Sequence, residues 1–218
     1  MQGASRVVSV QVGKIAPLGR EGVPSAFVKA AVKGSVEAGE MGLAGDEQAD
    51  LRVHGGRDKA VYFYPFEHYA RWSADVPRHA ATLAPGAFGE NVTTAGLDEA
   101  GVAIGDVFRV GTATVQVTQP RQPCAKLGLR FGDNTLGRVM MQTGRSGWYV
   151  RVLEAGRLGA GDGVELVGRK NAVWTIARFN DFILHRRTDR GVLQELDGLE
   201  GLAQVWREKV REALERGA

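Results

Sequence analysis

The sequence predicts a mainly β fold of short strands that closes, or nearly closes, on itself, followed by a small helical segment. Three observations carry this prediction. Short alternating apolar and polar runs recur before Lys170, glycine accounts for 30 of 218 residues, and the apolar spacing becomes helical after Lys170. Alternation indicates strands buried on one face, and glycine supplies the tight turns between them. We therefore predict two domains, residues 1–170 and residues 171–218.

The alternation places the strands in chain order. Strands are expected at residues 6–12, 59–64, 104–110, 113–118, 148–153 and 161–167. Pro65 ends the second of these strands, and residues 66–72 are typical of a short helix that starts after it. Gly111 lies between two apolar runs and predicts the turn of a hairpin.

The tail predicts three helices. One begins at Trp174, a second covers residues 191–199, and the clearest runs from Leu202 to Leu214 with apolar residues three and four apart. Short helices of this kind bury little surface alone, so we expect them to pack on the β structure or on a partner. A homodimer through the tail stays open.

The overall charge is mildly basic, with a net charge of +3 and a pI of about 9.2. Most lysines and arginines alternate with acids, which argues against a nucleic-acid-binding face. The single cysteine cannot form an intramolecular disulfide. Residues 1–12 lack the apolar core of a signal peptide, and no run approaches the ~20 apolar residues of a membrane helix. We expect a cytoplasmic protein without membrane partners.

The most informative stretch is residues 119–127, which read Gln-Pro-Arg-Gln-Pro-Cys-Ala-Lys-Leu. It follows a strand and leads into a predicted short helix at residues 125–129, so Cys124 would lie at a helix N-terminus. Arg121 and Lys126 add positive charge, and together these features favour a thiolate, the nucleophilic and metal-binding form. The alternative is an inert buried thiol. The charged and proline neighbours favour the reactive interpretation.

Three other polar stretches carry candidate ligand contacts. Residues 45–59 combine acids with Arg52, His54 and Lys59 at a Gly-Gly corner and predict anion contacts, although a polar surface loop explains them as well. Asn91, in a Gly-Glu-Asn phrase, can hydrogen-bond a heterocycle, but the phrase also occurs in many turns. Arg145, between glycines, can present its guanidinium to a phosphate or lie in a simple hairpin turn.

Several common sites are missing from the sequence. It contains no Walker P-loop, no dinucleotide fingerprint after a strand and no zinc-binding cluster of cysteines and histidines. ATP-dependent, NAD-dependent and zinc-dependent enzymes of the usual kinds are therefore not predicted.

Taken together, these stretches resemble the MOSC family, named after the C-terminal domain of molybdenum cofactor sulfurase. The matching segments are residues 46–59, 88–91, 119–127 and 144–153. The match is close to the bacterial branch linked to resistance against N-hydroxylaminopurine. That branch also carries a C-terminal three-helix domain, which resembles residues 174–214 here.

The resemblance implies a β-barrel that binds the molybdenum cofactor, molybdopterin. It implies that Cys124 either ligates molybdenum through its thiolate or carries sulfur as a persulfide. Contacts to the pterin and its phosphate are implied for Arg52, His54, Lys59, Asn91, Arg121 and Arg145. Asn91, Arg121 and Lys126 are implied to assist Cys124 in catalysis. A soft thiolate suits a sulfur-rich metal centre, and cations suit an anionic cofactor.

The resemblance also implies a reaction, the reduction of N-hydroxylated bases by N–O cleavage, with a separate reductase supplying electrons. The alternative is a sulfur carrier or cofactor-delivery protein, in which a Cys124 persulfide adds about 32 Da. A third hypothesis is a small β-barrel that binds nucleic acid. The absence of a clustered basic face with interleaved aromatic residues argues against it.

Overall fold

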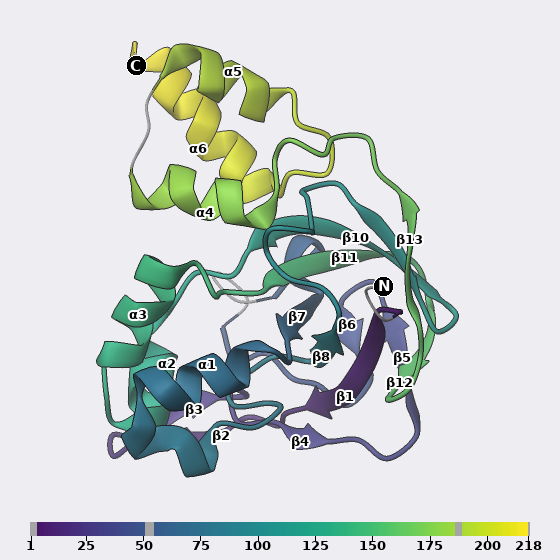
Figure 1. Ribbon diagram of the computed structural model, residues 1–218, viewed down its shortest axis with the longest axis vertical. Coiled ribbons are helices and arrows are strands. Elements are labelled where there is room, and N and C mark those ends of the chain that lie inside the picture. The colour runs from purple at the N-terminus through teal and green to yellow at the C-terminus, as the bar shows by residue number, and fades with distance from the viewer. Residues whose placement is uncertain (1–3, 51–54, 186–188, 218) are drawn as a thin grey trace.

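The computed structural model describes residues 4–50, 55–185 and 189–217, and these form a large curved sheet with helices at its sides (Figure 1). The sheet has eight strands in the order β13-β9-β10-β11-β7-β8-β1-β4. In chain order they are β1 (Arg6–Val12), β4 (Ala30–Ala31), β7 (Val61–Pro65), β8 (Val92–Ala95), β9 (Val107–Val110), β10 (Ala113–Pro120), β11 (Trp148–Glu154) and β13 (Val164–Gly168). Neighbouring strands are antiparallel except β7 and β8, which pair in parallel.

Two smaller ladders complete the described strands. One joins β12 (Gly156–Gly159), β5 (Ser35–Gly39) and β6 (Gly42–Leu43), and the other joins β2 (Ala16–Leu18) and β3 (Val23–Ser25). The predicted hairpin is confirmed, because β9 and β10 pair around Gly111, whose φ is 58°. Pro65 is the last residue of β7, as predicted. That strand begins at Val61 because the preceding residues form the 3₁₀ turn η1 (Arg57–Lys59).

The mainly β prediction is confirmed, but the sheet does not close into a complete barrel. Within the described residues its end strands, β13 and β4, are not paired with each other. Instead β1 meets the start of β13 through one bridge between Arg6 and Gly163, with a hydrogen bond of 2.9 Å from Val164 N to Ser5 O. A single bridge brings the two sides together without a continuous ladder, so the barrel remains open.

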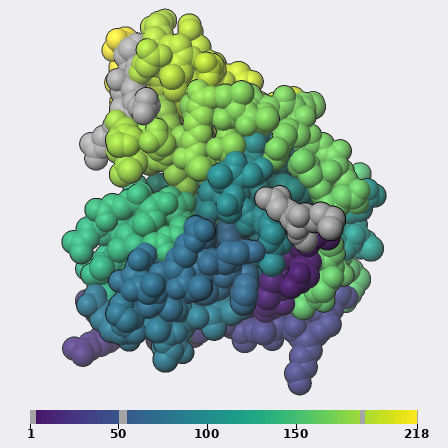
Figure 2. All heavy atoms as spheres, in the orientation of Figure 1, coloured from purple at the N-terminus to yellow at the C-terminus, as the bar shows by residue number. Residues whose placement is uncertain are grey.

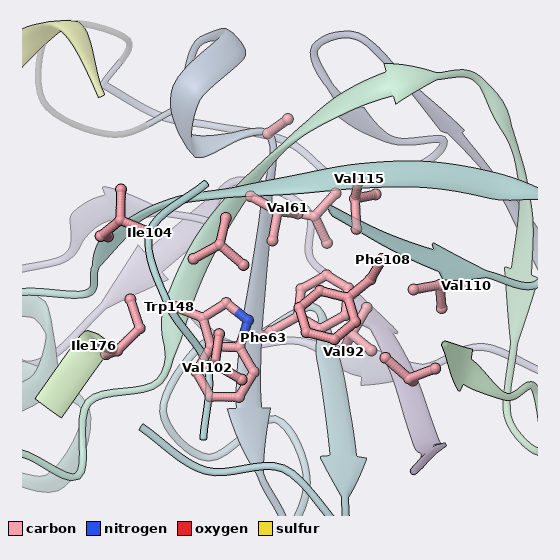
Figure 3. Close-up of a cluster of buried hydrophobic side chains, with 14 of the residues drawn as sticks. Val61, Phe63, Val92, Val102, Ile104, Phe108, Val110, Val115, Trp148 and Ile176 are labelled. Carbon is pink, nitrogen blue, oxygen red and sulfur yellow. The ribbon is translucent and has the colours of Figure 1, made fainter. Parts of the chain in front are cut away.

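The main core lies inside this curved sheet. Trp148 and Phe63 are 1% and 2% exposed and face valines from neighbouring strands. Figure 3 shows Ile176 close to Val102 and Trp148 in the same cluster. Because Ile176 belongs to the C-terminal helices, the tail shares the core of the sheet.

A second cluster forms between the sheet and three helices near its other side. These helices are α1 (His68–Asp75), α2 (Ala125–Phe131) and α3 (Thr135–Thr143), with the 3₁₀ helix η2 (Pro77–Thr82) after α1. Tyr64 of β7, Trp72 of α1 and Leu136 of α3 are fully buried here with Phe88. This packing fixes α2, and with it the residues just before α2, against the sheet.

The C-terminal residues form α4 (Ile176–Leu184), α5 (Arg190–Asp197) and α6 (Gln204–Glu215), and Figure 2 shows them at one end of the molecule. All three predicted helices are present, with boundaries shifted by one or two residues. Backbone hydrogen bonds tie them to the sheet, including Ile176 N to Val102 O at 2.8 Å and Ala203 N to Thr118 O at 3.1 Å. The tail therefore packs on the β structure of its own chain.

Among the described residues, no helix has the length and apolar composition needed to cross a bilayer.

Candidate functional site

Cys124 lies at the junction between β10 and α2, as the sequence predicted. β10 ends at Pro120, and Cys124 is the extended residue immediately before α2, with φ −129° and ψ 165°. Its carbonyl accepts a hydrogen bond of 3.0 Å from Leu127 N, which starts the helix. The thiol is free and its residue is partly exposed, so it is accessible from a cavity instead of lying inert in the core.

Arg121 is the closest charged partner of this sulfur. Its Nη2 donates to Cys124 Sγ over 3.5 Å, and its Nη1 donates to Gln122 O over 2.8 Å. The residue is only 3% exposed, and its guanidinium carbon lies 5.7 Å from the centre of the Tyr62 ring. Burial alone lowers the pKa of Arg121, but the charges available on Tyr62 and Cys124 outweigh burial and raise it. The guanidinium of Arg121 therefore places a permanent cation beside the sulfur.

The cavity around the sulfur is built from segments far apart in the sequence. Five of the candidate residues line it together, namely Lys59, Asn91, Arg121, Cys124 and Lys126. Arg121, Cys124 and Lys126 come from the β10–α2 junction, while Lys59 ends η1 and Asn91 precedes β8. The pairing of β10 with β11, and of β7 with both β11 and β8, brings these segments to one place.

A buried ion pair that the sequence analysis missed lies in the same wall. Lys29 Nζ contacts Asp46 Oδ1, and the two side chains are 7% and 6% exposed. Asp46 also accepts from Gly13 N at 2.7 Å and from Asn91 Nδ2 at 2.8 Å. Burial lowers the pKa of Lys29, and the Asp46 carboxylate opposes that shift. The pair therefore holds a cation in the cavity wall at a substantial desolvation cost.

Asn91 has its amide engaged by the protein. Its Oδ1 accepts from Tyr62 N at 3.1 Å, and its Nδ2 donates to Gln11 O at 3.3 Å as well as to Asp46. The side chain thus links β1, β7 and the Lys29–Asp46 pair. In this arrangement Asn91 positions the cavity wall, and its amide has no donor left over for a ligand.

Gly89 and Glu90, the two residues before Asn91, show what the Gly-Glu-Asn motif does in the structure. Glu90 is fully buried and accepts from Gly86 N at 2.6 Å, from Phe88 N at 3.1 Å and from the Tyr69 hydroxyl. Burial raises the pKa of Glu90 even though these donors oppose the shift. Gly89 has φ 78°, and a Cβ there would come within 3.0 Å of the Phe27 ring. The phrase therefore shapes the loop that forms one wall of the cavity.

Two lysines supply further positive charge to the cavity lining. Lys59 is partly buried, and burial followed by repulsion from Lys209 lowers its pKa. Lys126 lies in the first turn of α2, two residues after Cys124. With Arg121 and Lys29 they give the described lining four cations against the two carboxylates of Asp46 and Glu47, and this excess of positive charge suits an anionic group.

The remaining candidates are not among the described residues that line this cavity. Arg145 does not line this cavity in the described part of the chain: it is 7% exposed, pairs with Asp75 and stacks on Trp72 with its guanidinium carbon 4.7 Å from the ring centre. Arg52 and His54 fall outside the described residues. The structure therefore brings together five of the eight candidates and gives Arg145 a packing role.

The chemistry of this donor set fits a sulfur-rich metal cofactor better than a metal ion bound by protein alone. Within residues 4–50, 55–185 and 189–217, no three His, Cys, Asp or Glu side chains are grouped closely enough to hold a metal. Cys124 offers one soft ligand, so the remaining ligands would have to come with the cofactor. The cations around it match an anionic phosphate.

Comparisons with known proteins identify the family of this chain. The MOSC domain family matches residues 50–165, and the YiiM-like, 3-alpha helix domain family matches residues 174–217. The protein YiiM of Escherichia coli (strain K12) is 41% identical over 199 residues, covering 91% of this chain and 88% of YiiM. The crystal structure of YiiM from Geobacillus stearothermophilus superimposes with a TM-score of 0.81 at 34% identity, over 96% of this chain and 99% of that chain.

A longer relative carries the same region as one part. A protein named "Reductase" from Gibberella moniliformis (strain M3125 / FGSC 7600) is 34% identical over 192 residues, which cover 87% of this chain but only 34% of the reductase. The coverage by the two domain families and the identity with YiiM lead to one conclusion: this chain belongs to the MOSC family and ends in a YiiM-like three-helix domain.

Proposed function

We propose that this protein is a molybdenum-cofactor enzyme that reduces N-hydroxylated bases and related compounds by cleaving their N–O bond. One observation carries the proposal. The only thiol of the chain lies on a cavity wall, 3.5 Å from the guanidinium of a buried arginine and beside further lysines. A soft ligand surrounded by cations is the combination that a sulfur-rich, phosphate-bearing metal cofactor requires.

In this proposal each described residue has a defined task. Cys124 Sγ would hold the metal, while Lys59 and Lys126 would balance the charge of the cofactor phosphate. Arg121 would balance the charge on the sulfur through its Nη2 contact. When bound, the cofactor supplies the two-electron chemistry, and the protein supplies binding and orientation.

The overall reaction also needs protons. Reduction of R–NH–OH to R–NH₂ and water consumes two electrons and two protons, and the released oxygen leaves as water. We assign Lys29 to the proton supply, because its ammonium lies in the cavity wall and Asp46 holds it there. Burial favours the neutral amine, so Lys29 Nζ gives up a proton more readily than a solvated lysine does. Asp46 then favours its reprotonation.

The electrons would come from a separate reductase. The name "Reductase" of the Gibberella moniliformis relative supports a reductive reaction. The expected compartment is the cytoplasm, where a lone thiol stays reduced.

A second candidate function is sulfur transfer. The partial exposure of Cys124 and its contact with Arg121 would also serve a persulfide, whose terminal sulfur is negatively charged. This alternative requires no bound molybdenum. An added mass of about 32 Da on Cys124, in protein without metal, would identify it.

The experiment that tests the proposal is metal analysis followed by turnover. The protein is purified anaerobically from a host that makes the cofactor, beside Cys124→Ser and the control Ala125→Ser, which adds a hydroxyl but keeps the thiol. We expect near-stoichiometric molybdenum in the parent and the control, and at least a tenfold loss in Cys124→Ser, because even the residues that support a metal ligand cost about 10–100-fold in metal affinity when they are replaced. Loaded parent protein that reduces no N-hydroxylated purine with a chemical reductant would refute the enzyme proposal.

A further inference from the structure

Arg121 is a buried cation whose neutral protein contacts do not compensate its charge. The residue is 3% exposed, and its Nη1 donates to Gln122 O over 2.8 Å and to Met140 Sδ over 3.7 Å. Its Nη2 donates to Cys124 Sγ over 3.5 Å. Among the described residues, no carboxylate pairs with this guanidinium. A buried charge is costly unless a partner compensates it. Of the three acceptors, the sulfur of Cys124 is the one that can carry a compensating negative charge.

The ring of Tyr62 lies against this guanidinium. The guanidinium carbon of Arg121 is 5.7 Å from the ring centre, and Tyr62 is itself 3% exposed. A cation is attracted to an aromatic ring, and the attraction is stronger away from water. Burial raises the pKa of Tyr62, so its hydroxyl stays protonated at neutral pH and the ring brings no charge of its own. The ring therefore holds the guanidinium without neutralising it, and the positive charge remains available to Cys124.

The residues around the start of β11 fix the Tyr62 ring. The Tyr62 hydroxyl donates to Ser146 O over 2.7 Å. Gly147 has φ 63°, and a Cβ there would stand 3.0 Å from the Tyr62 ring and 2.2 Å from Phe63 O, so this close packing requires a glycine. Tyr149 is the cross-strand partner of Tyr62 between β11 and β7, and the two ring centres are 5.2 Å apart. These contacts leave the ring little freedom to move.

We propose that Tyr62 is a positioning residue for the thiol: its ring holds the Arg121 guanidinium beside Cys124 Sγ, and the residues around the start of β11 hold the ring. The inference rests on the proposed function for the purpose of that charge, which in the enzyme balances the charge on the sulfur. The position of the guanidinium does not depend on which reaction the thiol serves. The role of Tyr62 can therefore be tested without turnover.

Alkylation of Cys124, the only cysteine of the chain, measures the charge beside its sulfur. Full-length protein is prepared without the cofactor and treated at one pH with iodoacetate, which is anionic, or with iodoacetamide, which is neutral. The added mass is followed with time. In both reactions the thiolate displaces iodide and forms a thioether, so the ratio of the two rates cancels the thiolate fraction. A cation beside the sulfur attracts iodoacetate and raises this ratio, and added salt reduces the effect.

Two variants and their combination give the central result. Arg121→Gln sets the ratio for a site without the guanidinium, and we expect that ratio to lie about three- to tenfold below the parent at low salt. Tyr62→Leu removes the ring but keeps Arg121, and we expect its ratio to fall to nearly the same value. The double variant should show no further fall, because both changes remove the same interaction. An unchanged ratio in either single variant, or a further fall in the double variant, would overturn the proposal.

Two matched controls separate the ring from its hydroxyl and from a general loosening of the core. Tyr62→Phe keeps the ring and loses the bond to Ser146 O, and its ratio should stay near that of the parent. Tyr64→Leu removes a fully buried ring from the same strand, and among the described residues Tyr64 has no contact with Arg121. Its ratio should not change. A fall in either control as large as that in Tyr62→Leu would overturn the proposal.

Circular dichroism and thermal unfolding check that each variant is folded. If Tyr62→Leu does not fold, Tyr62→Met takes its place, because its longer side chain fills more of the space of the ring while removing the aromatic face. Molybdenum analysis and turnover keep this inference apart from the proposed function. If the ratio falls as expected but the parent binds no molybdenum, the role of Tyr62 stands and the cofactor proposal fails. If the loaded parent reduces N-hydroxylated compounds and Tyr62→Leu keeps the parent ratio, the reaction stands and the role of Tyr62 is overturned.

Discussion

Replacing Asp46 by asparagine tests the buried ion pair in the wall of the Cys124 cavity. The change keeps the shape of the side chain but removes its charge, so the Lys29 ammonium is left buried beside a neutral amide. It also disturbs the hydrogen bonds. Asp46 Oδ1 accepts from Gly13 N, and Oδ2 accepts from Asn91 Nδ2 at 2.8 Å. If the new carbonyl keeps the Gly13 contact, the new amide nitrogen faces the Asn91 nitrogen, donor against donor.

The expected cost follows from this geometry. Removing one member of a buried ion pair costs about 3–5 kcal/mol. Lys29 can lose its proton and avoid carrying an unpaired charge, so we expect the lower end, about 3 kcal/mol at pH 7. For a chain of this size that loss lowers Tm by roughly 6–12 °C.

The pH dependence has a definite sign. The pKa of Lys29 in the folded protein lies below its ordinary value of 10.5, so between these two pKa values the unfolded chain binds more protons. Stability from this group therefore rises as pH increases toward 10.5 and is lost as pH falls through the folded pKa. Removing the Asp46 carboxylate lowers the pKa of Lys29 in the folded protein further. The pH range over which this group changes the stability therefore becomes wider. The destabilisation by Asp46→Asn must consequently not grow as the pH rises from 7 to 9.5.

Urea unfolding at both pH values measures this difference against the parent. The double variant Lys29→Met with Asp46→Asn should be more stable than Asp46→Asn alone, because it leaves no charge to bury. Glu165→Gln is the control, since its exposed pair with Arg109 contributes at most about 1 kcal/mol. A loss below about 1 kcal/mol for Asp46→Asn, or one that grows with pH, would refute the reasoning.

Two further substitutions test the packing around the site by thermal unfolding. Gly89→Ala should cost about 1 kcal/mol more than Gly34→Ala: both glycines have φ near 78°, but a Cβ at Gly89 comes within 3.0 Å of the Phe27 ring, whereas Gly34 has open space. Equal losses would contradict the contact with Phe27. Ile176→Ala should cost about 2–5 kcal/mol, because Ile176 is fully buried between α4 and the sheet, while Ile15→Ala, at a residue that is 47% exposed, should cost far less. A small loss at Ile176 would mean that the tail does not depend on this core.

Local signals explain what the sequence predicted well. The strands β1, β9, β10 and β11 follow alternating apolar residues that the core selects. The position of Cys124 at the start of α2 follows from Pro120 and Pro123, which limit the backbone before the helix. These features depend on residues that are close together in the chain, so they can be predicted without knowledge of the tertiary structure.

Features that depend on distant segments were not predictable in the same way. Lys29 lies in an unremarkable stretch before β4 and becomes part of the cavity only because Asp46 meets it there. The stretch containing Asp46 was noted for its charges, but nothing in it specified a lysine 17 residues earlier. Arg145 shows the converse: its glycine neighbours suggested a ligand contact, yet Trp72 and Asp75 of α1 engage its guanidinium.

The end of β10 explains why a helical tail accompanies this particular cavity. Thr118 is fully buried, and its carbonyl accepts from Ala203 N just before α6, while its hydroxyl donates to Asp58 O in η1 at 2.6 Å. Pro120 follows two residues later and leads into the loop that carries Cys124. One stretch of backbone therefore fixes the tail, the η1 loop and the thiol relative to one another. A displacement of α6 would therefore strain the strand that leads to Cys124, so the packing of the tail and the position of the thiol are coupled.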